Sequence, residues 1–140
     1  MRVSAVPYEV VDVLWDEAKS LLEPALKFAK RRFTIESVKE HIDGQYIALW
    51  VAMDDENKLK AAITTRVQEY PNGRALEMDW IGGEEMDKWF PQFQEKLEEY
   101  ARSMKCDFMT GQGRKGWKKI LQNAGWQEEH VSFRKDLTDE

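Results

Sequence analysis

Two carboxylates, Glu77 and Asp79, stand two residues apart in the segment Ala75–Ile81, which has the alternating pattern of a strand. Side chains two apart on a strand project from the same face, so both carboxylates would reach into one space. Such carboxylates can accept the proton of an amine, which is general-base catalysis. The sequence leaves a structural alternative, in which both face solvent or pair with Arg66 or Arg74 across a hairpin.

Two glycine-containing segments are candidates for binding an anion. Gly82 and Gly83 break the expected strand and lead into a long helix, whose N-terminal N–H groups can bind phosphate. The segment Gly111–Gly116 combines a flexible backbone with Arg114 and Lys115, and such a nest can grip a phosphate or a carboxylate. Its spacing fits neither a P-loop nor a dinucleotide-binding fingerprint. The alternative is a solvated turn whose glycines serve geometry alone.

Cysteine and histidine offer little further chemistry. Cys106 is the only cysteine, which excludes an intramolecular disulfide and a cysteine-rich zinc site, and we expect it to be a buried small hydrophobe. His41 and His130 have no partner residues at metal-ligand spacing, so we expect surface histidines and no metal site.

The hydrophobic pattern predicts one α/β (α+β) domain over residues 1–140, with the order β-α-α-β-β-β-α-β-α-β and helices on both faces of a mixed sheet. The expected strands are residues 1–7, 45–53, 59–67, 75–81, 107–110 and 126–137. The expected helices run from Pro7 to a break or kink at Pro24, over 35–42 with Thr34 as N-cap, from Asp87 to Met104, and over 117–123.

Residue faces follow from these elements. Residues 45–53 are apolar on both faces, which predicts an interior strand, and Leu76, Met78 and Trp80 are expected to share one face. The aromatic residues of the long helix are predicted to lie in the core. Tryptophans 15, 80, 89 and 117 leave a second possibility, an exposed aromatic patch that would form a protein interface.

Composition limits the classes of partner. The chain has a formal net charge of −5 and a pI of about 5.2, so it lacks the basic footprint of a nucleic-acid-binding protein. It contains no apolar run near 18 residues and no signal-peptide pattern, so we expect a soluble, intracellular protein without membrane contact.

The element order resembles that of the GNAT N-acetyltransferases over the whole chain, and the motifs resemble them from Leu76 to Trp126. Residues 76–87 resemble the strand, glycine loop and helix that hold the CoA pyrophosphate in that family, and residues 120–126 resemble its closing turn. The resemblance implies acetyl-CoA as a possible cofactor and Glu77, then Asp79, as the base. The implied cofactor-binding residues are Trp80, Ile81, Gly82, Gly83, Glu84, Arg114 and Lys115.

Two departures weaken the family pattern. Glu84, Glu85 and Asp87 crowd the place of a dianionic pyrophosphate, and no basic or amide residue precedes the glycines. Leu121 stands where many members have the tyrosine that protonates the leaving thiolate.

The departures favour a GNAT-fold protein with a degraded acetyl-CoA site that works by contact with an unknown protein. It most resembles the divergent GNAT-like proteins of tailed phages and prophages, which would place it in the host cytoplasm or the virion. The alternative is an acyl-CoA-dependent N-acetyltransferase of a small or protein amine.

Overall fold

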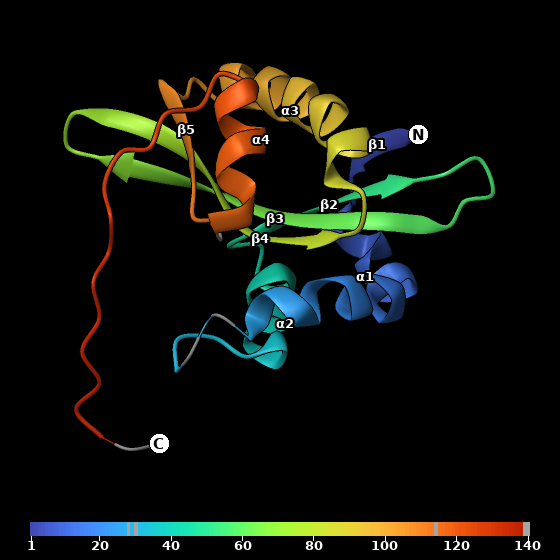
Figure 1. Cartoon of the computed structure of the whole chain (residues 1–140). Helices are drawn as coiled ribbons and strands as arrows, with labels where there is room; N and C mark the ends of the chain where they lie inside the picture. The colour runs from blue at the N-terminus through green and yellow to red at the C-terminus, as the bar shows by residue number, and fades with distance from the viewer. Residues whose placement is uncertain (28, 30, 114, 139–140) are drawn as a thin grey trace.

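The computed structural model describes residues 1–27, 29, 31–113 and 115–138, with only the backbone of Lys115 (Figure 1). In that part of the chain, the strands β1 (Arg2–Ala5), β2 (Ala48–Met53), β3 (Leu59–Tyr70), β4 (Gly73–Gly83) and β5 (Phe108–Gly111) form one sheet in sequence order. All neighbouring strands pair antiparallel except β4 and β5, which are parallel. The predicted mixed α/β fold is therefore confirmed.

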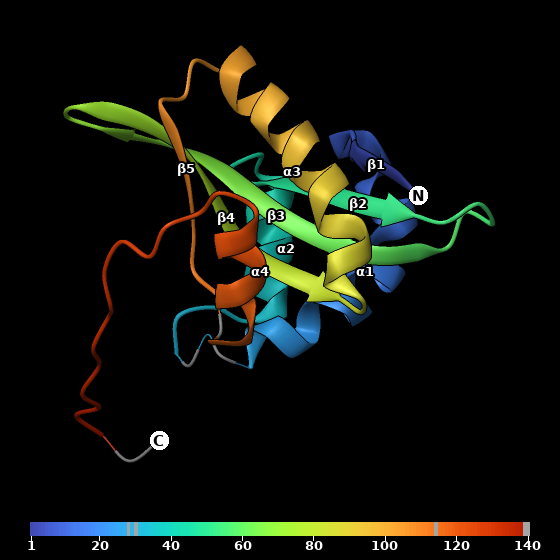
Figure 2. The same cartoon turned by 45° about the horizontal axis from the view of Figure 1, so that its top comes forward.

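Helices cover both faces of this sheet. Helix α3 (Met86–Ser103) and the short α4 (Lys118–Asn123) lie over one face, and α1 (Val11–Leu26) and α2 (Ile35–Asp43) lie over the other (Figures 1 and 2). The interior strand β2 sends Trp50 and Ala52 towards α3, and Leu49 and Val51 towards α1 and α2. Its apolar residues on both faces thus divide between two cores, as the sequence predicts.

A β-bulge in β4 changes which residues share a face. Thr64 pairs with Trp80 while Thr65 pairs with Met78, so Asp79 is an extra residue in β4. Leu76 and Met78 therefore pack in the α3-side core, but Trp80 packs on the opposite side and Ile81 takes its place. The expected common face of Leu76, Met78 and Trp80 is wrong at Trp80, because the bulge reverses the alternation.

Several helix and strand ends differ from the predicted ones. Thr34 caps α2 as predicted, with a reciprocal capping box formed with Ser37. Pro24 does not end α1, which runs on to Leu26. Helix α3 begins at Met86 rather than after Asp87, which places Pro91 beyond the first turn. Gly82 and Gly83 do not break β4, because they pair with β3 there.

The predicted last strand is also wrong. Residues 127–138 form no strand: Glu128 pairs with Lys118 of α4 at 3.2 Å, and the end of the segment extends away from the body of the molecule (Figures 1 and 2). Their apolar side chains find no covering surface in the described structure, and a strand needs a neighbour to satisfy its main chain. No helix within the described residues is long and apolar enough to cross a membrane.

Candidate functional site

The candidate site lies where β4 and β5 part. The two strands pair from Ala75–Phe108 to Met78–Gly111, and β5 then ends while β4 continues to Gly83. Among the described residues, no strand covers that edge of β4 from the bulge at Asp79 onwards. An uncovered edge offers main-chain N–H and C=O groups to a ligand.

A hollow of about 390 Å³ opens beside this part of β4. Its walls come from the end of β4, the start of α3 and the segment that leads into α4, and they comprise Gly83, Glu85, Met86, Gly116, Trp117 and Ile120. Met86 and Trp117 are buried, and Trp117 contacts the ring of Trp89 in the core. The hollow is therefore mainly apolar, with the N-terminus of an 18-residue helix at one end.

The glycines of the predicted pyrophosphate loop have separate roles. A Cβ on Gly82 would lie 1.8 Å from the Leu21 carbonyl oxygen, so Gly82 allows α1 to approach β4. Gly83 has φ +140° and would bring a Cβ within 2.6 Å of the Lys60 carbonyl oxygen. Gly82 thus serves packing on the α1 side, whereas Gly83 lines the hollow.

Carboxylates surround the start of α3, as the sequence indicates. Glu85 occupies the N-cap position in the left-handed region at φ 55°, and its carboxylate pairs with Lys88 at 3.2 Å. The carbonyl of Glu84 accepts a hydrogen bond from the indole of Trp89 at 2.7 Å, which fixes the turn before the helix. The negative charges complement the helix dipole and oppose a phosphate.

Glu77 and Asp79 do not line this hollow, and both contact Arg66 of β3. The Arg66 Nε donates to both Asp79 oxygens at 3.1 and 3.2 Å, and Nη2 lies 2.6 Å from Glu77. Glu77 also accepts a hydrogen bond from the Tyr70 hydroxyl. The pairing with Arg66 that the sequence leaves open is therefore present, while the role of either carboxylate as a base stays a prediction.

Burial raises the pKa of Asp79 above its ordinary value of 3.8, with a smaller upward contribution from Glu77, and Arg66 opposes the rise. The carboxylate is thus a stronger base than an ordinary aspartate. Trp80, the next residue along β4, packs edge-on against Phe33, which also packs against His41 of α2, with centroids 5.7 and 5.8 Å apart.

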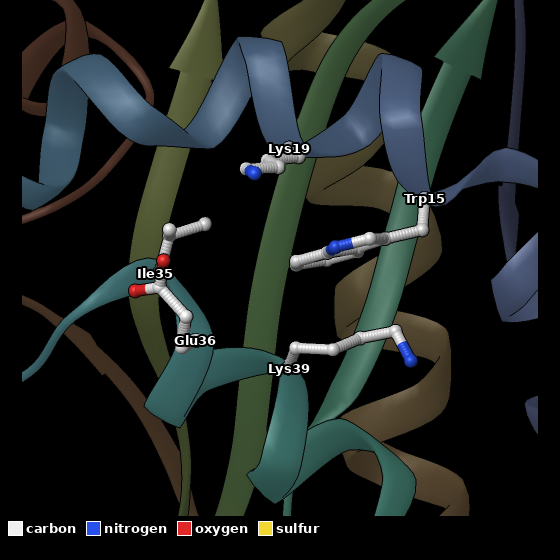
Figure 3. A pocket seen from close by; sticks show the side chains of 5 residues that line it. All are labelled: Trp15, Lys19, Ile35, Glu36 and Lys39. Carbon is white, nitrogen blue, oxygen red and sulfur yellow. The ribbon is translucent and has the colours of Figure 1, made fainter.

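A second, smaller hollow of about 170 Å³ lies between α1 and α2 (Figure 3). Lys19 and Lys39 flank the Trp15 ring, and Ile35 and Glu36 close the far side. The Lys39 Nζ is already bound by Asp12 and Asp43, each at 2.8 Å. We assign this hollow to helix packing because its half-buried Lys39 is already paired with two carboxylates.

The other predicted residues take the following places. Arg114 and the side chain of Lys115 lie outside the described residues, and Gly116 alone of that loop lines the hollow. Trp89 and Trp117 are 0% and 9% exposed, so the aromatic patch is wrong and the core prediction for the long helix is confirmed.

Burial raises the pKa of the half-buried Cys106, which argues against a reactive thiol. His41 and His130 are exposed as predicted, and no cluster of potential metal ligands occurs among the described residues.

Sequence reasoning missed the apolar wall of the hollow, whereas it did offer Arg66 as a partner of the two carboxylates. Met86, Trp117 and Ile120 stand in ordinary amphipathic patterns, which do not distinguish a core residue from a cavity wall.

Solved structures show which class of fold this is. A probable acetyltransferase superposes with a TM-score of 0.75 at 15% identity, over 100% of both chains. The aminoglycoside 6′-N-acetyltransferase AAC(6′)-Ig from Acinetobacter haemolyticus gives 0.67 at 14% identity, over 99% of this chain and 100% of that one. A ribosomal-protein-alanine N-acetyltransferase from Brucella melitensis gives 0.68 at 13%, over 98% and 100%.

The chain therefore has the GNAT acetyltransferase fold. No protein-family model matches the sequence, and no curated protein matches it.

Proposed function

We propose that this protein is an acyl-CoA-dependent N-acyltransferase. The carrying observation is the uncovered edge of β4 after the bulge at Asp79, next to an apolar hollow that ends at the N-terminus of α3. The hollow suits the pantetheine arm of an acyl-CoA, and the β4 main chain suits the acyl carbonyl. Acetyl-CoA is the natural candidate, because structures with the same fold belong to acetyltransferases.

An amine is the acceptor that the opposite side of β4 favours. The similar structures are named for acetylation of an aminoglycoside and of a ribosomal-protein alanine, both of which offer amino groups. Asp79 combines a raised pKa with a position at the bulge, so it would take the proton as the amine attacks the thioester carbonyl. Arg66 would hold the carboxylates in place. The sequence analysis ranks Glu77 before Asp79 as the candidate base. We reverse that order because Glu77 also accepts a hydrogen bond from the Tyr70 hydroxyl.

A binding protein with a degraded acetyl-CoA site is the second candidate. Glu84, Glu85 and Asp87 at the start of α3 favour it, since they oppose a pyrophosphate, and Leu121 offers no proton to a thiolate. A role in a phage particle or its assembly would be one form of this candidate. The separated strands and the buried tryptophans favour the enzyme instead.

Calorimetric titration with acetyl-CoA tests the proposal when the wild-type protein is compared with the Gly116→Trp variant. A Cβ on Gly116 meets no heavy atom within 4 Å, so the fold should tolerate a new side chain that occupies the hollow. We expect the wild-type protein to bind and Gly116→Trp to lose binding at least tenfold. Lys119→Trp is the matched control, because Lys119 is exposed on α4 outside the hollow, and it should bind like the wild type.

Absence of binding by the wild-type protein at millimolar acetyl-CoA would contradict the enzyme and leave the binding protein. Equal binding by Gly116→Trp would show that the ligand lies elsewhere. If binding behaves as expected, release of free CoA in the presence of a panel of primary amines measures the transfer itself.

A further inference from the structure

Four aromatic rings form a row beside the paired carboxylates, on the side of β4 that faces α1 and α2 (Figure 1). Trp80 packs edge-on against Phe33, with ring centroids 5.7 Å apart. Further along the row, His41 lies between Phe33 and Tyr46, with centroids 5.8 and 6.1 Å away. Because Trp80 follows Asp79 directly in β4, one end of this aromatic row lies at the candidate base.

The outer rings of the aromatic row are open to solvent. Phe33 is 38% exposed, Tyr46 is 76% exposed, and His41 is exposed as well. An aromatic ligand would remove this apolar surface from water and pack edge-on or stacked against the rings. Burial raises the pKa of Asp79 most, and the charge of His41 is among those that oppose the rise, so the imidazole lies within electrostatic reach of the carboxylate. A ligand ring on Phe33 and His41 would therefore bring an attached amino group to Asp79.

The charges on this side of β4 suit a single amino group. The carboxylates of Glu77 and Asp79 share one guanidinium, that of Arg66, so the cluster keeps one net negative charge for a ligand. Arg66 is held in this place by Gln68 as well, whose side-chain oxygen accepts from Nη1 at 2.8 Å. The segment that leads into Phe33 carries cations of its own, Lys27, Arg31 and Arg32. A ligand with several ammonium groups would meet repulsion here, whereas a monoamine would not.

We propose that the acceptor of the acyl group is an aromatic monoamine, whose ring packs on Phe33 and His41 and whose nitrogen reaches Asp79. This inference rests on the proposed acyl transfer and names its acceptor. The nitrogen forms a bond to the thioester carbonyl carbon as the C–S bond breaks. One proton of the ammonium group passes to Asp79 and then to solvent, and a second protonates the departing thiolate, which leaves a neutral amide and free CoA.

A matched panel of amines is the first test, with release of free CoA from acetyl-CoA as the readout. 2-Phenylethylamine and 2-cyclohexylethylamine have the same carbon skeleton, but only the first is aromatic, and spermidine carries several ammonium groups. We expect kcat/KM for 2-phenylethylamine to exceed that for the cyclohexyl amine about threefold and that for spermidine about tenfold. Equal values for all of these amines, or a preference for spermidine, would overturn the aromatic monoamine and leave acyl transfer intact.

Phe33→Leu tests the aromatic row itself, because leucine keeps apolar bulk and removes the ring. We expect KM for 2-phenylethylamine to rise about fivefold, with little change in kcat or in the affinity for acetyl-CoA. Phe108→Leu is the matched control, since Phe108 is 43% exposed and stacks on Tyr70 outside the aromatic row, and its KM should equal the wild-type value. An unchanged KM in Phe33→Leu, or an equal rise in both variants, would overturn the role of the row.

NMR separates this inference from the acyl transfer on which it rests. 2-Phenylethylamine is titrated into the wild-type protein with and without CoA, and the ring signals of the aromatic row are followed. We expect shift changes at Phe33, His41 and Trp80. Such changes in a protein that fails to bind acetyl-CoA would contradict the transferase and still support the aromatic amine site. No change at millimolar amine, with or without CoA, would overturn the site.

Discussion

The two sides of β4 differ in the kind of surface they offer. On the α3 side, an apolar hollow meets uncovered main chain and a helix N-terminus. On the α1 and α2 side, Glu77 and Asp79 are already paired with a cation, beside aromatic rings. The bulge at Asp79 separates these surfaces, because it reverses the alternation of the strand. Under the proposed function, the thioester would lie on one side of β4 and the amine on the other, and the two would meet at the open edge of β4 beyond the end of β5.

The largest expected effect is the loss of stability in Gly82→Ala, which tests whether Gly82 packs against α1. Gly82→Ala would drive a Cβ into the main chain of Leu21, so we expect a loss of about 3 kcal/mol in the free energy of unfolding, measured by urea denaturation. Gly116→Ala is the control and should be nearly neutral, since its Cβ meets open space. A mild Gly82→Ala with impaired acetyl-CoA binding would instead assign Gly82 to the ligand.

Removal of Arg66 tests whether the paired carboxylates on the α1 and α2 side of β4 are separate from the acetyl-CoA site. Arg66→Met keeps most of the side-chain length but leaves Glu77 and Asp79 without their common partner. Because the group is partly exposed, we expect destabilisation of only about 1 kcal/mol by thermal or urea unfolding, with acetyl-CoA affinity unchanged. A large loss of acetyl-CoA affinity would show that the two surfaces are not separate.

A charge reversal at the hollow tests the opposite side. Glu85→Lys replaces a carboxylate at the start of α3 by a cation, so we expect acetyl-CoA affinity to rise about fivefold, or about 1 kcal/mol, by calorimetry. Glu95→Lys makes the same change on an exposed part of α3 outside the hollow and should leave affinity unchanged. Weaker binding by Glu85→Lys would contradict the assigned ligand position.

The smallest effect is a pH dependence from Asp79. Its folded-state pKa is raised, so between 3.8 and that higher value the folded protein keeps a proton that the unfolded chain has lost. Stability should therefore fall as the pH rises through this window, and this contribution should vanish in Asp79→Asn. Carboxyl titration by NMR measures the pKa directly, and Arg66→Met should raise it further. A pKa at or below 3.8 would contradict the account.

The sequence carried enough information for the layers of the fold and for the region of the site. The apolar run over residues 45–53, which contains β2, and the Thr34 cap are local patterns that a sequence displays directly. The bulge at Asp79 could not be predicted, because it depends on register with β3, and it moved Trp80 to the opposite side of the sheet. Gly82 shows the same limit, since its role is set by α1, some 60 positions earlier in the chain.

The prediction of the last strand was wrong for a related reason. Within the predicted strand 126–137, only Val131 to Arg134 alternate apolar and polar residues, and the structure gives the segment no neighbouring strand among the described residues.

The most direct test of the central claim is an amide NMR titration of the wild-type protein with acetyl-CoA. We expect shift changes at Gly83–Met86, at Gly116–Ile120 and along the open edge of β4 after Asp79, with little change in α1 and α2. No change at millimolar ligand, or changes centred on the Trp15–Lys39 hollow, would contradict the assignment of the α3 side of β4 to an acyl-CoA.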